Sequence, residues 1–123
     1  QATESARILA LRQSLWQQLQ VLDGVQLNGH LTQRLSGNLN VSVRGVDGQA
    51  LLLGLQQKLA VSSGSACTSA SMAPSHVLTA LGHDKELARS SIRFGIGRFN
   101  TQDEIRQAAA HFAATVSSLR VRD

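Results

Sequence analysis

The sequence contains few cysteine, proline and aromatic residues. Its 123 residues include one cysteine, one proline, one tryptophan and no tyrosine. A single cysteine cannot form an internal disulfide, which favours a reducing, cytoplasmic compartment. No segment resembles a signal peptide, and no apolar run approaches the roughly 20 residues of a membrane span. We therefore expect a soluble, cytoplasmic protein that does not associate with a membrane.

The composition favours one globular domain over residues 1–123. Hydrophobic residues make up 42% of the chain and charged residues 16%, so a single core can form. The net charge is +4, but the basic residues are spread from Arg7 to Arg122 without a cluster. This spread argues against nucleic-acid binding and fits a mildly basic surface. Alternatively, some of the arginines contact a partner or another domain.

Hydrophobic spacing predicts four helices. A first amphipathic helix ends near Gly24, and Asp47 is placed to cap a second. Pro74 and Gly82 bracket a short third helix, and Thr101 with Glu104 forms a capping box for the last. The residues expected on the buried stripes are Ile8, Leu11, Leu15, Leu19, Leu22, Leu51, Leu52, Leu55, Leu59, Val77, Leu78, Leu81, Ile105, Ala108, Ala109, Phe112, Val116 and Leu119.

Alternation of apolar and polar residues predicts strands between these helices. Residues 39–43 alternate Leu and Val with Asn and Ser, and a short strand is expected at residues 60–62. In residues 92–97, Ile92, Phe94 and Ile96 should be buried, while Arg93 should leave the sheet on the opposite face. The order of elements predicts an α+β fold with helices over a small, mainly antiparallel sheet.

Cys67 lies in a setting unusual for a structural cysteine. Structural cysteines behave as small buried hydrophobes among Val, Leu and Ile, whereas residues 62–71 contain only Ser, Gly, Ala and Thr besides the thiol. Such a segment has no bulky side chains to fix it, and Gly64 is conformationally free. Cys67 is therefore a candidate nucleophile.

Three segments of the sequence stand out: AVSSGSACTS at residues 60–69, APSHVL at 73–78 and SSIRFGIGRF at 90–99. They resemble the C-terminal part of cysteine desulfurases of the NifS/IscS type. Weaker similarity at residues 27–29, 38–42 and 101–104 extends the resemblance over essentially the whole chain.

The resemblance implies a pyridoxal-phosphate enzyme of fold type I that converts L-cysteine to L-alanine. Cys67 takes the position of the nucleophile that holds the sulfur as a persulfide, for delivery to a sulfur acceptor or iron-sulfur scaffold protein. The chain would be the C-terminal small domain of an enzyme that is a homodimer when intact. The large domain, with the cofactor-binding lysine, is expected outside this chain, because neither Lys58 nor Lys85 has the required context. Alone, the chain is expected to be inactive.

The resemblance also assigns a role to Arg93. It matches the arginine that holds the substrate carboxylate, and a planar guanidinium can grip a carboxylate with two parallel hydrogen bonds. Without the resemblance, a solvated or ion-paired surface arginine would be the simpler interpretation. Gly95 departs from the family pattern, in which serine is common at this position, so the packing around the substrate can differ.

Two other functions remain open. One is a non-catalytic docking module for a sulfur acceptor, and the other is a free-standing persulfide carrier. The carrier is disfavoured because no basic residue follows Cys67 before Lys85. The spacing of Cys67 and the four histidines, His30, His76, His83 and His111, matches no common metal site, so no metal is expected.

Overall fold

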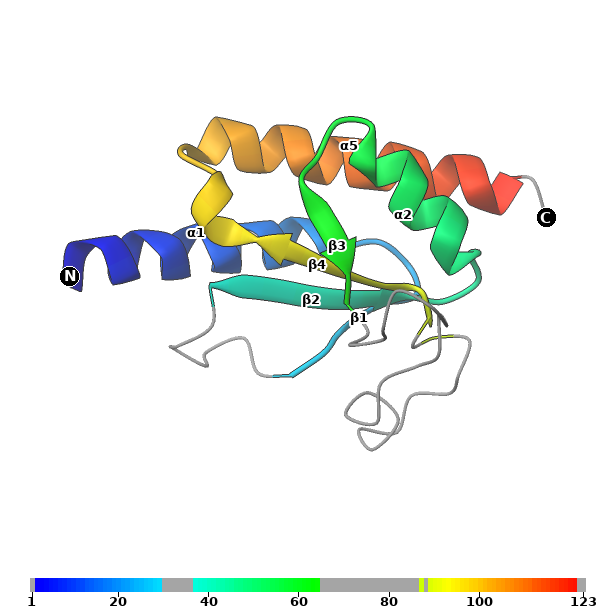
Figure 1. Ribbon diagram of the computed structural model, residues 1–123, viewed down its shortest axis with the longest axis horizontal. Coiled ribbons are helices and arrows are strands. Elements are labelled where there is room, and N and C mark those ends of the chain that lie inside the picture. Colours follow the sequence, from blue (N-terminus) through cyan, green and yellow to red (C-terminus); the bar gives the residue numbers. More distant parts are fainter. Residues whose placement is uncertain (1, 30–36, 65–86, 88, 122–123) are drawn as a thin grey trace.

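The computed structural model describes residues 2–29, 37–64, 87 and 89–121. Within these ranges the chain forms three α-helices, four β-strands and one short 3-10 helix (Figure 1). In chain order they are α1 (Ala2–Leu19), β1 (Val25–Leu27), β2 (Asn38–Val43), α2 (Gly48–Gln56), β3 (Val61–Ser63), β4 (Ser91–Gly95), the 3-10 helix η1 (Ile96–Arg98) and α5 (Gln102–Val121).

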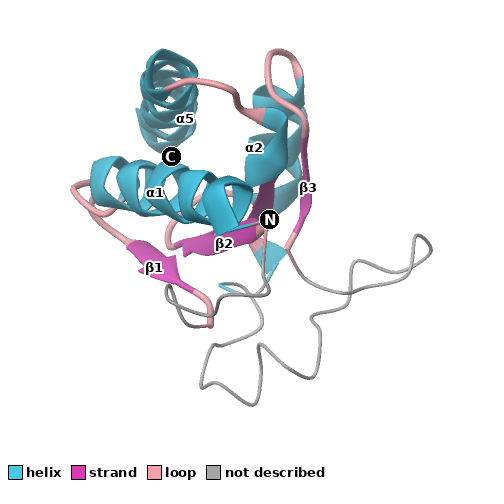
Figure 2. Cartoon of the chain, turned by 90° about the vertical axis from the view of Figure 1, so that its left-hand side faces the viewer, coloured by secondary structure: helices cyan, strands magenta, loops and turns pink. Residues whose placement is uncertain are grey.

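The four strands form one antiparallel sheet in the order β1-β2-β4-β3. The long central pair aligns Leu39 with Phe94 and Val41 with Ile92. Figure 2 shows α1, α2 and α5 on one side of this sheet. The predicted α+β fold, with helices over a small antiparallel sheet, is thus confirmed.

The core lies between the sheet and the three helices. Leu15 and Leu19 of α1, Leu51 and Leu55 of α2, and Phe112 of α5 are completely buried. The rings of Phe94 and Phe112 join sheet to helix, with their centroids 5.9 Å apart. Burying apolar side chains in this way is the main favourable contribution to folding. The helical spacing in the sequence therefore identified the buried faces of all three described helices.

The predicted helix caps form at Asp47 and Thr101. The Asp47 carboxylate accepts a hydrogen bond of 2.9 Å from the Ala50 N–H. Thr101 Oγ1 accepts one of 3.1 Å from the Glu104 N–H. The Glu104 carboxylate accepts from the Asn100 N–H at 2.6 Å, one residue before the partner that a capping box predicts. The cap therefore also fixes the chain that enters α5.

The structure differs from the sequence prediction at four places. The first helix ends at Leu19, not near Gly24, because the chain turns there, with the Leu22 N–H donating to the Leu19 carbonyl. The predicted strand ends at Gly95, and Ile96 begins η1, where it stays buried while the Phe99 N–H closes the turn onto its carbonyl. The second helix, expected to extend to Leu59, ends at Gln56, so Lys58 and Leu59 lie in the turn beyond it. Strand β1 is only three residues long, too short for alternation to indicate it. The helix predicted between Pro74 and Gly82 lies outside the described residues.

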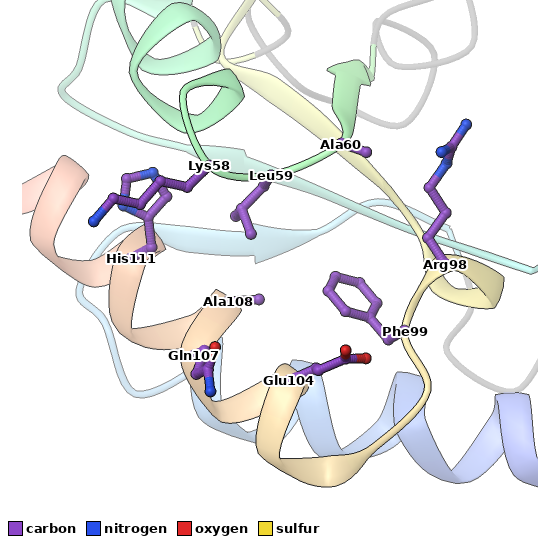
Figure 3. Close-up of a pocket in the computed structure, with 9 residues that line it drawn as sticks. All are labelled: Lys58, Leu59, Ala60, Arg98, Phe99, Glu104, Gln107, Ala108 and His111. Atoms are coloured by element: carbon purple, nitrogen blue, oxygen red, sulfur yellow. The ribbon is translucent and has the colours of Figure 1, made fainter.

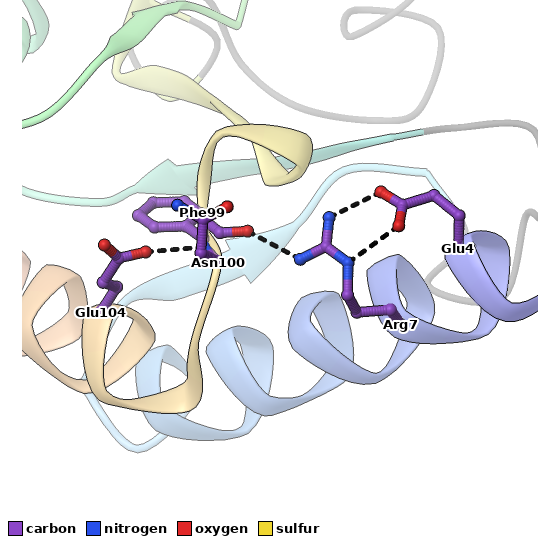
Figure 4. A network of polar contacts seen from close by, with 5 residues as sticks. All are labelled: Glu4, Arg7, Phe99, Asn100 and Glu104. Carbon is purple, nitrogen blue, oxygen red and sulfur yellow. Dashed lines mark hydrogen bonds and ion pairs between the residues drawn. The ribbon is translucent and has the colours of Figure 1, made fainter.

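Arg7 ties α1 to the segment between η1 and α5. Its guanidinium donates two hydrogen bonds to the Glu4 carboxylate, at 3.1 and 2.6 Å, and one of 2.9 Å to the Phe99 carbonyl (Figure 4). The hydrogen bonds from Arg7 lower the pKa of Glu4, and those to Glu4 raise the pKa of Arg7. The ionised pair thus holds the arginine in position to reach across to Phe99.

Glu4 should make a pH-dependent contribution to stability. Because its pKa is lowered in the folded chain, the contribution is present above its unfolded value of 4.5 and is lost as the pH falls through the folded pKa. We expect the wild-type chain to be slightly more stable than Glu4→Gln at pH 6 in urea unfolding, with the difference shrinking as the pH falls below 4.5. The gap at pH 6 should shrink in high salt, since the pair is exposed. A gap that grows on acidification would contradict this assignment.

Candidate functional site

The sheet has a polar face on the side opposite the helices. Arg93 lies at the centre of β4 on this face, paired in register with Asn40 of β2 and Ser62 of β3. Its neighbours Ile92 and Phe94 are completely buried on the core side, whereas Arg93 is only partly buried. The predicted direction of Arg93 is confirmed, and its role as a carboxylate-binding residue stays a prediction.

Four side chains on this face form a connected set, here called the polar cluster: Asn28, Asn40, Ser42 and Ser91. Asn28 Nδ2 donates to Asn40 Oδ1 at 3.0 Å and to Ser42 Oγ at 2.9 Å. The hydroxyls of Ser42 and Ser91 share a hydrogen bond of 2.8 Å. Asn28, Ser42 and Ser91 are each at most 8% exposed. Buried polar groups are costly unless they are hydrogen-bonded, so these contacts must form for the face to be stable.

Gly64 lies where the chain leaves the sheet toward Cys67. Its N–H donates to the Ser91 carbonyl at 2.8 Å, and its own carbonyl accepts from Asn40 Nδ2 at 2.9 Å. A Cβ atom at this position would lie 2.3 Å from Asn40 Oδ1 and 2.8 Å from Ser91 Cβ, too close for any side chain. Glycine is therefore required here by close packing.

Several residues singled out in the sequence lie outside the described ranges. They are Cys67, Lys85, His30, His76 and His83. Among the described residues, no three His, Cys, Asp or Glu side chains come together in a way that could hold a metal ion. No helix within the described ranges is both long and apolar enough to cross a membrane.

A pocket of about 310 Å³ lies on the helix side, between α5 and the turn that leads into β3 (Figure 3). Leu59, Phe99 and Ala108 contribute apolar surface, and Lys58 and His111 lie together at one end. His111 Nε2 is 3.2 Å from the Gly54 carbonyl, so this histidine connects α5 to α2.

The described residues do not form a site for pyridoxal phosphate. Such a site needs a lysine that can reach the cofactor beside the bound substrate. Lys58, the only lysine within the described part of the chain, lies beside α5, while Arg93 is on the other face of the sheet. The two side chains therefore lie on opposite sides of the sheet.

Comparison with known families shows which family the chain belongs to. The model of the family described as aminotransferase class-V matches residues 2–108. The chain belongs to the class-V aminotransferase family. It is 52% identical over 118 residues to a protein named cysteine desulfurase IscS from Aeromonas hydrophila, covering 96% of this chain and 29% of that protein. It is 53% identical over 119 residues to the protein of the same name from Pseudomonas aeruginosa strain LESB58, with 97% and 29% covered.

Solved structures give the same result. A NifS-like protein from Rickettsia africae superposes with a TM-score of 0.74 at 28% identity, over 92% of this chain and 29% of that one. A second NifS-like protein gives a TM-score of 0.74 at 27% identity. The resemblance to NifS/IscS-type proteins is therefore confirmed. The chain spans about 29% of the length of the relatives and structures that it matches.

Ser42 gives a test of the polar cluster. Ser42→Ala removes a buried hydroxyl that bonds both Asn28 and Ser91, so the free energy of unfolding should fall by about 1–3 kcal/mol. Ser62→Ala is the matched control, since Ser62 is exposed on the same face, and it should change stability by less than about 0.5 kcal/mol. Equal effects of the two substitutions in urea unfolding would show that the cluster does not stabilise the sheet.

Proposed function

We propose that this chain is the C-terminal small domain of a cysteine desulfurase and that Cys67 receives the sulfur. The observation that carries the proposal is the identity of 50–53% to proteins named cysteine desulfurase IscS, over at least 96% of this chain. In the proposed reaction the Cys67 thiol and L-cysteine give a Cys67 persulfide and L-alanine. The substrate loses its carbon–sulfur bond, a sulfur–sulfur bond forms on Cys67, and the carbon gains hydrogen, so the atoms balance.

The geometry of the polar face supports this assignment. Arg93 presents a guanidinium beside β3, and a guanidinium binds a carboxylate through two parallel hydrogen bonds. Gly64 follows directly after β3, and Cys67 is three residues further along the sequence. Three residues span at most about 11 Å, so the thiol is tethered close to the end of the edge strand β3, which pairs with the strand that carries Arg93. The proposed carboxylate-binding residue and the tether of the proposed sulfur-accepting thiol thus come from two neighbouring strands of one sheet.

The remaining parts of the machinery belong to the rest of the proposed enzyme. Pyridoxal phosphate would supply the electron sink that weakens the carbon–sulfur bond, bound by a large domain that the described residues do not provide. We propose that the intact enzyme is a cytoplasmic homodimer. It would transfer the persulfide sulfur to an acceptor or scaffold protein for iron-sulfur cluster assembly or thio-modification.

Cys67→Ser should abolish persulfide formation. The experiment uses the protein that contains this sequence, at its natural length, mixed with pyridoxal phosphate and L-cysteine. Intact mass should show one added sulfur atom on wild-type protein and none on the variant, because the serine hydroxyl does not hold sulfane sulfur. The absorbance of bound cofactor is the control and should be the same in both proteins. Sulfur loading that persists in Cys67→Ser would contradict the assignment, and loading of wild-type protein without cofactor would instead support a free-standing carrier.

Arg93→Gln should weaken substrate binding. Losing a charge-assisted, bidentate contact costs about 1.5–3 kcal/mol, which corresponds to a rise in KM for L-cysteine of roughly 10- to 100-fold. Arg98→Gln is the matched control, because Arg98 is an exposed arginine in η1 that lines the pocket on the helix side. Steady-state alanine production measures both variants. An unchanged KM in Arg93→Gln would contradict the proposal that Arg93 binds the substrate carboxylate.

A further inference from the structure

Three strands are joined at a single residue, Gly64. Its N–H bonds to the main chain of β4 at Ser91, and its carbonyl accepts from the side chain of Asn40 in β2, while β3 leads into it. Gly64 is buried and has no room for a Cβ atom. The main chain is therefore held on both sides at the last described residue before Cys67.

The amide of Asn40 is itself held in one orientation. Its Nδ2 donates to the Gly64 carbonyl, and its Oδ1 accepts from Asn28 Nδ2, which also donates to Ser42. An amide with a donor and an acceptor each engaged cannot turn over without losing both hydrogen bonds. Asn40 also lies opposite Arg93 in the pairing of β2 with β4. The Asn40 side chain thus links Gly64, three residues before Cys67, to the strand pairing that positions Arg93.

We infer that Asn40 is a positioning residue for sulfur transfer, a role that rests on the proposed function of Cys67. By holding the Gly64 carbonyl, Asn40 fixes the point from which the thiol is tethered, at a set place beside the substrate's carboxylate site. A fixed tether raises the effective concentration of the thiol at the substrate sulfur. Both hydrogen bonds of the Asn40 amide go to Gly64 and Asn28, so we expect its effect on the transfer step and not on substrate binding.

Asn40→Leu tests this inference, with Gln26→Leu as the matched control. Leucine has a similar volume but cannot donate to the Gly64 carbonyl. Gln26 is a partly buried amide like Asn40, lies on β1 and is opposite Ser42. In the natural-length protein we expect kcat for alanine formation to fall about 10- to 100-fold in Asn40→Leu, with KM for L-cysteine within about twofold of wild type. Gln26→Leu should leave both constants close to wild type.

A second readout does not depend on turnover. The rate at which iodoacetamide alkylates Cys67, followed by intact mass in protein without cofactor, should rise in Asn40→Leu, because releasing Gly64 frees the start of the segment. A purely structural role would lower the melting temperature without separating kcat from KM or changing this rate. Should Asn40→Leu fail to fold, Asn40→Ser decides the question, since serine stays polar but is too short to reach Gly64.

The outcomes separate this inference from the proposed function. A folded Asn40 variant with wild-type kcat, or one with raised KM and an unchanged alkylation rate, would overturn the positioning role. That result would leave the proposed function intact, provided that Cys67→Ser abolishes the persulfide. If Cys67→Ser still accepts sulfur, the proposed function itself fails, whatever the Asn40 variants do.

Discussion

The pairing of β2 with β4 is the constraint on which the rest of the domain depends. It is the longest strand pair in the sheet, and it sets Val41 against Ile92 on one face and Asn40 against Arg93 on the other. A slip of β4 by one residue would exchange the two faces of that strand. It would bury the guanidinium of Arg93 in the core and expose the apolar side chains. The hydrophobic core and the polar face therefore depend on the same register, and α1, α2 and α5 stabilise that register by covering only the apolar side.

The polar cluster also helps to determine the alignment of the strands. Asn28, Ser42 and Ser91 are almost completely buried, and a buried polar group without a partner costs about 1–3 kcal/mol. Their partners come from β2, β4 and the residue that follows β1, so the hydrogen bonds form together only in one alignment of the strands. Hydrophobic burial favours many arrangements of similar volume, whereas directional hydrogen bonds distinguish between them. The cluster thus explains how small polar residues can specify the sheet as strictly as its leucines and valines do.

Most of the fold could be predicted from the sequence, because the residues at its core repeat with regular spacing. The stripes of α1, α2 and α5, the caps at Asp47 and Thr101, and the alternation through Phe94 all depend on neighbours within a few positions. The candidate site was only partly predictable. The alternation indicated the direction of Arg93, but it also made Asn40 and Ser42 look like ordinary outward-facing residues of a half-buried strand. Their burial and their contacts depend on Asn28, Gly64 and Ser91, which are 12 to 49 positions away in the sequence. No local pattern contains that information.

Gly64 shows how sequence and structure assign different reasons to the same residue. In the sequence, it suggested backbone freedom at the start of a segment of small residues. In the structure, its backbone is held by hydrogen bonds on both sides, and glycine is needed because Asn40 and Ser91 leave no space for a Cβ atom. A glycine can be required by an unusual backbone angle or by the close approach of two segments of the chain. The second reason applies to Gly64, and it makes the position rigid. The segment that carries Cys67 therefore starts from a fixed point of the sheet. In the proposed reaction the Cys67 thiol has to meet a substrate held at Arg93 on the neighbouring strand, and a fixed starting point limits the volume in which the two groups must find each other.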